Sequence, residues 1–320
     1  MKSIAYVIPY FGHLPKNFHL VLESMRYNPT IDWLIFTDDK KAFDYPDNVR
    51  VVYCSFNEIK QLIQSKFDFD IVLNKPWGLC DFKAAYGEIF EDYLKDYDFW
   101  GYCDLDLMFG NLRDYFTDDM LNEYDKIGYQ GHSTIYKNEF NNNRVYRCDV
   151  DGTVSYREAF STEKGYCFDE NHITDKYEKL GLKQYTKTNF AHLDKFNHGF
   201  FLRHLPQDES FKNKHQVFLW EKGKLTRYYL YDKNLVAQEE YMYIHFWCRP
   251  MTYCDAISNR YLIYADKIIP FTKEITHKII KKYSKNNAIV FYTKAVYLNR
   301  KKLSVKRILK NLKLRKGRAK

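Results

Sequence analysis

The chain has 320 residues, of which 45% are hydrophobic and 18% aromatic. A chain of this length and composition can bury a sizeable core, which excludes a disordered protein and fits one large α/β domain or one domain with an appendage. No segment approaches the roughly 18 consecutive apolar residues needed to cross a bilayer, and the apolar run Ile4 to Ile8 is too short for a signal peptide. We therefore predict a cytoplasmic protein.

Seven cysteines are scattered along the chain, and no two of them have C-x-x-C spacing. An odd number without paired spacing argues against a disulfide framework and against a zinc site. We predict that these residues are ordinary reduced thiols: Cys54, Cys80, Cys103, Cys148, Cys167, Cys248 and Cys254.

Positive charge is concentrated at the C-terminal end. The segment from Lys273 to Lys320 holds seventeen Lys and Arg residues against Glu274 alone and so carries +16, whereas the whole chain carries +9 and the remainder therefore −7. Apolar residues alternate with these bases at near-helical spacing: Leu303, Ile308, Leu309, Leu312 and Leu314. This pattern is typical of a basic amphipathic helix on an anionic membrane surface, although a solvated helix has the same composition. The acidic body and the lack of a nucleic-acid-binding motif argue against a nucleic-acid partner.

Strands and helices are predicted to alternate through the first hundred residues. Four apolar runs predict strands, at Ile4–Ile8, Trp33–Phe36, Val49–Tyr53 and Phe99–Cys103. Three segments with apolar residues three or four apart predict helices, at Pro15–Met25, Phe56–Phe67 and Asp81–Tyr93. This order predicts an α/β fold with a mainly parallel sheet flanked by helices, whose ligands bind beyond the carboxyl ends of the strands.

The regular alternation ends near Asp118. Residues 131–165 are polar and predict loops, whereas Val217 to Tyr231 predicts a hairpin with Gly223 at its turn. No internal repeat and no flexible interdomain linker is evident in the sequence.

Two carboxylates, Asp104 and Asp106, follow the predicted strand Phe99–Cys103. Side chains two apart on an extended chain point to the same face, so both acids can share one cation. Hard oxygen ligands suit Mg²⁺ or Mn²⁺, which usually keep positions open for substrate phosphates. The pair therefore indicates nucleotide-diphosphate chemistry, although short acidic pairs also occur in ordinary turns.

Five motifs, in this order and spacing, resemble bacterial glycosyltransferases of the GT-A fold: I-P-Y-F-G, F-T-D-D, D-F-K-A-A-Y-G, C-D-L-D and H-F-W-C-R-P-M. The resemblance covers roughly Ile4 to Met251. Within that group the chain is similar to a polysaccharide-biosynthesis family of capsule and lipopolysaccharide gene clusters, long described only as a domain of unknown function. The resemblance implies a metal-dependent transferase that moves a sugar from a nucleotide sugar, a UDP-sugar, to a surface-polysaccharide intermediate.

The resemblance also implies a set of donor-binding residues. Tyr10 would stack on the base, Asp39 would accept a hydrogen bond from a uracil imide, and Lys83 would hold a phosphate. An ordinary turn and ordinary helix starts explain the same residue types equally simply. The full implied set is Pro9, Tyr10, Gly12, Thr37, Asp38, Asp39, Asp81, Lys83, Asp104 and Arg249.

The implied cofactor is Mn²⁺ or Mg²⁺, bound by Asp104, Asp106 and His245. His245 lies in a strand-like run, where a lone histidine is more often a core residue. Arg249, four residues later, would neutralise the leaving group.

The acidic cluster that contains Asp169 and Glu170 resembles the place from which inverting enzymes supply a general base. A helix N-terminus explains the same acids through the helix dipole. Two further loops could contact sugar, Gly131 to Ser133 and Asn197 to Gly199.

The predicted organisation is a GT-A domain over residues 1–272, with a nucleotide-sugar half to about 118, an acceptor half from about 119, and a basic helical tail over 273–320. If the tail lies on the inner face of the cytoplasmic membrane, the acceptor is a glycan or a lipid-linked oligosaccharide. Two other functions fit the residues: a nucleotidyl- or phosphotransferase, for which a glycine-rich phosphate loop is expected and not found, and a non-catalytic, membrane-associated glycan-binding protein.

Overall fold

The computed structural model describes residues 1–193, 202, 214–254, 258–285, 293 and 296–297. They belong to two compact units, of which the first comprises Met1–Ala191, Lys222–Leu225 and Tyr241–His245. The units divide the chain near residue 191, whereas the sequence predicts functional halves that meet at about residue 118, and these halves stay a prediction. Asn197 to Gly199 and most of the predicted basic tail lie outside the described residues.

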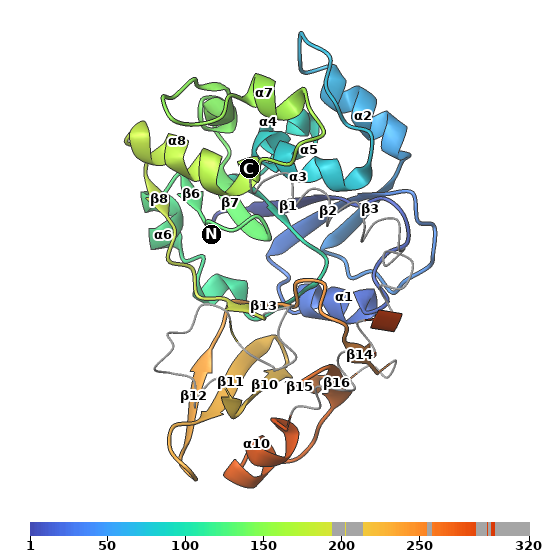
Figure 1. Cartoon of the computed structure of the whole chain (residues 1–320), viewed down its shortest axis with the longest axis vertical. Coiled ribbons are helices and arrows are strands. Elements are labelled where there is room, and N and C mark those ends of the chain that lie inside the picture. The colour runs from blue at the N-terminus through green and yellow to red at the C-terminus, as the bar shows by residue number, and fades with distance from the viewer. Residues whose placement is uncertain (194–201, 203–213, 255–257, 286–292, 294–295, 298–320) are drawn as a thin grey trace, which may run out of the picture. The chain divides into compact units, whose positions relative to one another are not determined.

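The first unit is built on a seven-stranded sheet with the order β3-β2-β1-β4-β7-β6-β8 (Figure 1). Its strands are β1 (Ile4–Pro9), β2 (Ile31–Thr37), β3 (Val49–Tyr53), β4 (Phe99–Cys103), β6 (Lys126–Ile127), β7 (Ser133–Lys137) and β8 (Gln184–Tyr185). Strands β3, β2, β1 and β4 are parallel, whereas β7 is antiparallel to both β4 and β6. The predicted α/β class is confirmed, with a sheet that is mixed.

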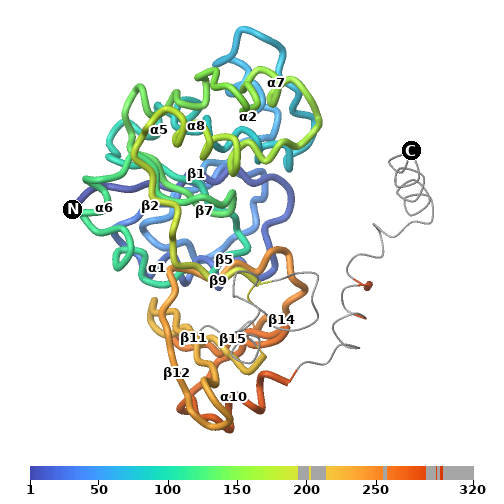
Figure 2. Tube along the Cα trace, turned by 60° about the vertical axis from the view of Figure 1, so that its left-hand side comes forward, coloured from blue at the N-terminus to red at the C-terminus, as the bar shows by residue number. Residues whose placement is uncertain are grey.

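Helices cover both faces of this sheet, because the strand side chains alternate between two apolar clusters. Ala5 and Val7 of β1 belong to one cluster, and Ile4, Tyr6 and Ile8 belong to the other. The first cluster includes side chains of α2 (Phe56–Gln64), α3 (Leu79–Phe82), α4 (Tyr86–Ile89), α5 (Glu91–Leu94), α7 (Tyr156–Phe160) and α8 (Ile173–Lys179). The second includes side chains of α1 (Phe18–Arg26) and α6 (Asp118–Glu123). Figure 2 shows α2, α5, α7 and α8 on one side of β1, β2 and β7, and α1 on the other.

Local sequence signals explain where α2 begins and which face it buries. Ser55 and Glu58 cap its N-terminus reciprocally, each side chain accepting a backbone N–H of the other residue. Ile59 and Ile63, four residues apart, are its buried residues. The prediction of a helix from Phe56 is therefore confirmed, although α2 ends three residues before the predicted end at Phe67.

The helix predicted over Asp81–Tyr93 is wrong as a single element, since the structure divides it into α3, a 3₁₀ turn at Lys83–Ala85, α4 and α5. The backbone leaves regular helical geometry at Ala85 (φ −100°, ψ 0°) and at Phe90 (φ −106°, ψ 24°). Both side chains are fully buried. Packing against the sheet has thus overridden the helical periodicity.

The expectation of loops throughout residues 131–165 is also wrong. This stretch contains β7, a 3₁₀ helix (Asn142–Arg147) and α7. Ser133 and Thr134 are polar yet buried in β7, where the ladder to β4 satisfies the backbone groups.

A second, three-stranded sheet has the order β5-β13-β9, with β5 (Leu107–Phe109), β13 (Tyr243–His245) and β9 (Ala191–His192). In this sheet β5 pairs antiparallel with β13, and His245 lies opposite Leu107. A segment more than 130 positions further along the chain thereby lies beside the end of β4.

The second unit contains most of a six-stranded sheet, in the order β12-β11-β10-β15-β16-β14. Its strands are β10 (Gln216–Glu221), β11 (Lys224–Leu230), β12 (Val236–Glu240), β14 (Thr252–Tyr253), β15 (Arg260–Tyr264) and β16 (Lys267–Pro270). Strands β10 and β11 form the predicted hairpin, with Lys222 (φ 47°) and Gly223 (φ 81°) in left-handed conformations at its turn.

The start of the predicted tail is part of this second unit. Helix α10 (His277–Tyr283) buries Ile280 in a cluster with Val217, Leu219 and Leu262. Among the described residues, no helix has the length and apolar character that a membrane crossing requires.

Replacing Gly101 by alanine tests the packing at the centre of the first sheet. A Cβ at Gly101 would lie 2.6 Å from Cγ2 of Ile135 and 2.7 Å from the carbonyl oxygen of Thr134, so the strands must separate. We expect Gly101→Ala to lower the free energy of unfolding by about 1–3 kcal/mol, measured by urea titration. Gly165→Ala is the control, because its Cβ would meet nothing closer than 3.8 Å. Equal midpoints for both variants would contradict this packing.

Candidate functional site

The bend between β4 and β5 carries the two acids of the C-D-L-D motif. Its backbone is fixed where the N–H of Asp104 donates to the carbonyl of His132, over 3.0 Å. Leu105 is buried, whereas the side chains of Asp104 and Asp106 are 37% and 24% exposed. The acids thus lie just beyond the strand, on either side of a leucine that anchors the bend in the core.

His245 reaches the same bend from β13. Its Nε2 lies 3.3 Å from Oδ1 of Asp106, and its side chain is buried. Asp104, Asp106 and His245 each offer one ligand atom, and these three atoms lie within 4.8 Å of one another. The fold therefore brings together the three residues predicted to bind a metal ion, and two carboxylates with one imidazole are a donor set that suits Mn²⁺ or Mg²⁺.

A buried histidine, His132, packs against His245. The centroids of the two rings are 4.2 Å apart, and Nδ1 of His132 lies 3.0 Å from the hydroxyl oxygen of Tyr243. Contacts of this kind fix the orientation of a ligand-bearing ring. The sequence alone predicts for His132 only a place in a loop that could contact sugar, and it does not single out Tyr243. The signal that could have found Tyr243 is its spacing of two from His245, which puts both side chains on one face of β13.

Lys83 is a buried cation beside the acids. Its Nζ lies 2.7 Å from Oδ1 of Asp104, 2.7 Å from the carbonyl oxygen of Gly131 and 3.8 Å from Oδ2 of Asp169. Burial alone would lower the pKa of Lys83, but the neighbouring charges, chiefly Asp104, raise it well above its usual value. Lys83 therefore carries its charge at neutral pH.

Asp169 and Glu170 lie in a π-helical turn (Phe168–His172) that leads into α8. Asp169 is buried, and burial is the main cause that raises its pKa to about 7; Lys83 opposes the shift. Oε1 of Glu170 accepts the N–H of Gly131 over 3.0 Å. A Cβ at Gly131 would lie 2.4 Å from Oδ2 of Asp169, so a larger residue there would displace the Asp169 carboxylate. The two acids predicted as catalytic thus share one cluster with Lys83.

Asp81 organises the chain just before that turn. Its carboxylate accepts the N–H groups of Tyr166 and Phe168, over 3.2 Å and 2.9 Å. The side chain is mostly buried. Asp81 therefore fixes the backbone of the residues that precede Asp169. Its predicted contact with a donor sugar stays a prediction.

The carboxyl ends of β1 and β2 bring the remaining N-terminal site residues together. Pro9 ends β1 opposite Phe36, and the N–H of Tyr10 donates to the carbonyl of Phe36 over 2.8 Å. Thr37 ends β2, fully buried, and its hydroxyl accepts the N–H of Asp39. This is the sheet edge at which ligands of parallel sheets bind.

Asp38 and Asp39 hold the loop that follows β1. Oδ1 of Asp38 accepts the N–H of Gly12 over 2.7 Å, where Gly12 has a φ of +90°. Oδ2 of Asp39 accepts the N–H of Leu14 over 2.9 Å, and that bond is the main cause that lowers the pKa of Asp39. Both acids thus have a structural role, and their contact with a nucleotide stays a prediction.

Arg249 belongs to the second unit. It is buried, its Nε donates to the carbonyl of Ala265 over 3.0 Å, and it follows two residues in left-handed conformations, Trp247 and Cys248. Its predicted action on a leaving group stays a prediction.

Some solved structures share a slight likeness with the chain. The galactosyltransferase LgtC, solved in complex with donor and acceptor sugar analogues, is 10% identical, with a TM-score of 0.35 over 59% of this chain and 75% of LgtC. Mouse xyloside xylosyltransferase 1 is 7% identical, with a TM-score of 0.31 over 61% and 88%. A mycobacterial protein is 11% identical, with a TM-score of 0.29 over 76% and 84%. These likenesses are too slight to assign a function.

No curated protein matches the chain. A family model, by contrast, matches most of its sequence. Residues 6–272 match one family, described as a family of unknown function, DUF6625. The match covers well over half of the chain and includes every predicted site residue, so the protein belongs to the DUF6625 family.

Proposed function

We propose that the protein is a metal-dependent glycosyltransferase that moves a sugar from a nucleotide sugar, a UDP-sugar, to an acceptor glycan of surface-polysaccharide biosynthesis. The observation that carries the proposal is one cluster in the first unit. Three metal-ligand candidates, a charged lysine and two further carboxylates meet there, beside a sheet edge at which parallel strands end. The resemblance of the five motifs to GT-A enzymes supports the same reading.

Asp104, Asp106 and His245 would hold Mn²⁺ or Mg²⁺. Their ligand atoms lie close enough together to share one ion. When bound, such an ion neutralises the negative charge of a diphosphate leaving group. Lys83 adds a fixed positive charge that is already present beside Asp104.

Asp169 is our candidate for the general base. The acceptor hydroxyl would give its proton to this carboxylate while its oxygen bonds to the anomeric carbon of the donor. The bond from that carbon to the diphosphate oxygen breaks, and the nucleoside diphosphate leaves with the bonding electron pair. A carboxyl group with a pKa of about 7 is suited to accept a proton at neutral pH. Glu170 accepts the N–H of Gly131, whose carbonyl oxygen accepts from Lys83, and so helps to hold this backbone segment beside the cluster.

We also propose that the protein lies on the inner face of the cytoplasmic membrane, where the acceptor is a lipid-linked oligosaccharide. The +16 charge of residues 273–320 supports this location. The whole chain should float with vesicles that contain phosphatidylserine, and not with neutral vesicles. A chain that ends at Lys285 should lose this binding, and half-molar salt should weaken it. Equal binding to both vesicle types would contradict an electrostatic anchor.

Asparagine at both acids of the bend tests the metal-centred mechanism. We expect Asp104→Asn with Asp106→Asn, and separately His245→Ala, to lower Mn²⁺-dependent turnover by at least about 100-fold, because an ion and its charge compensation are lost. The measurement is nucleoside-diphosphate release from a panel of UDP-, GDP- and dTDP-sugars, with added glycan acceptors.

Asp119→Asn, an exposed acid on α6, is the matched control and should retain full turnover. The proposal fails if the double variant turns over nucleotide sugars at the wild-type rate. It also fails if the protein consumes nucleoside triphosphates without sugar transfer.

The raised pKa of Asp169 predicts a pH-dependent stability. Because the unfolded chain releases this proton near pH 4 and the folded protein near pH 7, the stability of the folded protein falls as pH rises through this window and is level above it. Asp169→Asn removes this pH dependence. The melting temperature of the variant minus that of the wild type should therefore increase from pH 5 to pH 8. A difference that does not change with pH would contradict the buried, near-neutral carboxyl group. Asp119→Asn should show no such trend.

A further inference from the structure

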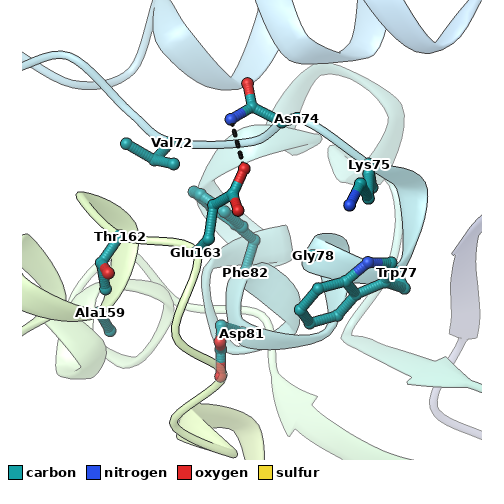
Figure 3. A pocket seen from close by; sticks show the side chains of 10 residues that line it. All are labelled: Val72, Asn74, Lys75, Trp77, Gly78, Asp81, Phe82, Ala159, Thr162 and Glu163. Atoms are coloured by element: carbon teal, nitrogen blue, oxygen red, sulfur yellow. Dashed lines mark hydrogen bonds between the residues drawn. The ribbon is translucent and has the colours of Figure 1, made fainter. Parts of the chain in front are cut away.

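Trp77 stands out among the tryptophans of the chain because it is exposed. Its side chain lies in a 3₁₀ turn (Pro76–Gly78) just before α3 and is 57% exposed, whereas Trp33, Trp100 and Trp220 are fully buried. The indole borders a pocket whose apolar lining includes Phe82 (Figure 3). An exposed aromatic ring at the rim of a pocket costs solvation free energy that a bound ligand can recover.

Polar groups surround the indole. Nδ2 of Asn74 donates to Oε1 of Glu163 over 2.7 Å, and Lys75 and Asp81 line the same pocket. Amide, carboxylate and ammonium groups together supply the donors and acceptors that hydroxyl groups require. One lysine against two carboxylates leaves a net negative charge, which disfavours a phosphate or a nucleotide. The pocket therefore fits an uncharged, hydroxyl-rich ligand.

Gly165 lies beside both the indole of Trp77 and the carboxylate of Asp81. A Cβ at Gly165 would lie 3.8 Å from Cζ3 of Trp77 and 4.0 Å from Oδ2 of Asp81. A larger side chain there would extend between the two. The exposed glycine therefore leaves room beside both groups that a larger side chain would occupy.

One chain segment contributes both to the pocket and to the cluster of Lys83, Asp104 and Asp169. Asp81, which lines the pocket, also accepts the N–H of Phe168, the residue before Asp169. Lys83, two positions further along the same helical run, contacts Asp104 and approaches Asp169. A ligand in the pocket would therefore lie on the chain segments that carry the candidate base.

We propose that this pocket binds one uncharged pyranose ring of the acceptor glycan. The C–H face of the sugar stacks on the indole of Trp77, and its hydroxyls bond to Asp81, Glu163 and Asn74. Its role as an acceptor site rests on the proposed glycosyltransferase function, whereas the binding of a sugar ring does not.

The test is saturation-transfer NMR of the whole chain with methyl glucoside, galactoside, mannoside and N-acetylglucosaminide, and with methyl glucuronide as the acidic comparator. We expect at least one of the neutral sugars to bind and the glucuronide to bind more weakly. Trp77→Ala should weaken binding of that neutral sugar at least 10-fold, while Trp77→Phe, which keeps an aromatic face, should retain most of it. Gly165→Leu should also weaken binding at least 10-fold, because the new side chain would extend between Trp77 and Asp81.

Circular dichroism and melting temperature verify that each variant is folded. The proposal is overturned if no neutral pyranoside binds, or if Trp77→Ala and Gly165→Leu bind as tightly as the wild type. The Asp104→Asn, Asp106→Asn double variant separates the two proposals, since it should bind the pyranoside normally while losing donor turnover. Absence of donor turnover in the wild type, with Trp77-dependent sugar binding intact, would instead contradict the glycosyltransferase function alone.

Discussion

One buried ammonium group, that of Lys83, balances the acidic centre of the first unit. It contacts Asp104 and the carbonyl of Gly131 and lies near Asp169, three groups from three separate segments of the chain. Without a cation the two carboxylates would repel each other, and the buried Asp169 would lose hydration free energy uncompensated. The lysine therefore stabilises the meeting of the bend after β4, the segment before β7 and the π-helical turn. The same fixed charge suits a site that receives a diphosphate.

The second constraint is the pairing of β5 with β13. It places His245 beside Asp106 and, through Tyr243 and His132, holds the imidazole in a buried setting. Nothing in the local sequence of either strand demands this register. It follows from two short apolar strands that bury Leu107, Phe109 and Tyr243 in the second apolar cluster of the first unit. The candidate metal ligands thus depend on a contact between distant parts of the chain.

Much of the first sheet could be predicted, because its strands are buried apolar runs with clear ends. Strands β3 and β4 have the predicted bounds. Strand β1 ends one residue later than predicted, and β2 begins two residues earlier and ends one residue later. The α3–α5 region could not be predicted, since its periodicity fits one helix and only packing divides it. Strand β7 could not be predicted, because Ser133 and Thr134 are polar residues that are buried in its ladder.

The candidate site was partly predictable for the same reasons. Asp104, Asp106 and His245 are predictable from their motifs, and the fold brings them together. The dual position of Asp81, between a pocket and the turn before Asp169, has no sequence signal. Nor does the exposure of Trp77, whose ring lies in the turn before α3 and beside Gly165 from a distant segment. A tryptophan between proline and glycine is equally compatible with a buried ring.

The most direct measurement of the central claim is Mn²⁺ binding, followed by electron paramagnetic resonance with and without UDP. The account predicts one Mn²⁺ bound per chain in the presence of UDP, and loss of that binding in the Asp104→Asn, Asp106→Asn double variant but not in Asp119→Asn. Mn²⁺ binding that is absent from the wild type, or unchanged in the double variant, would contradict it.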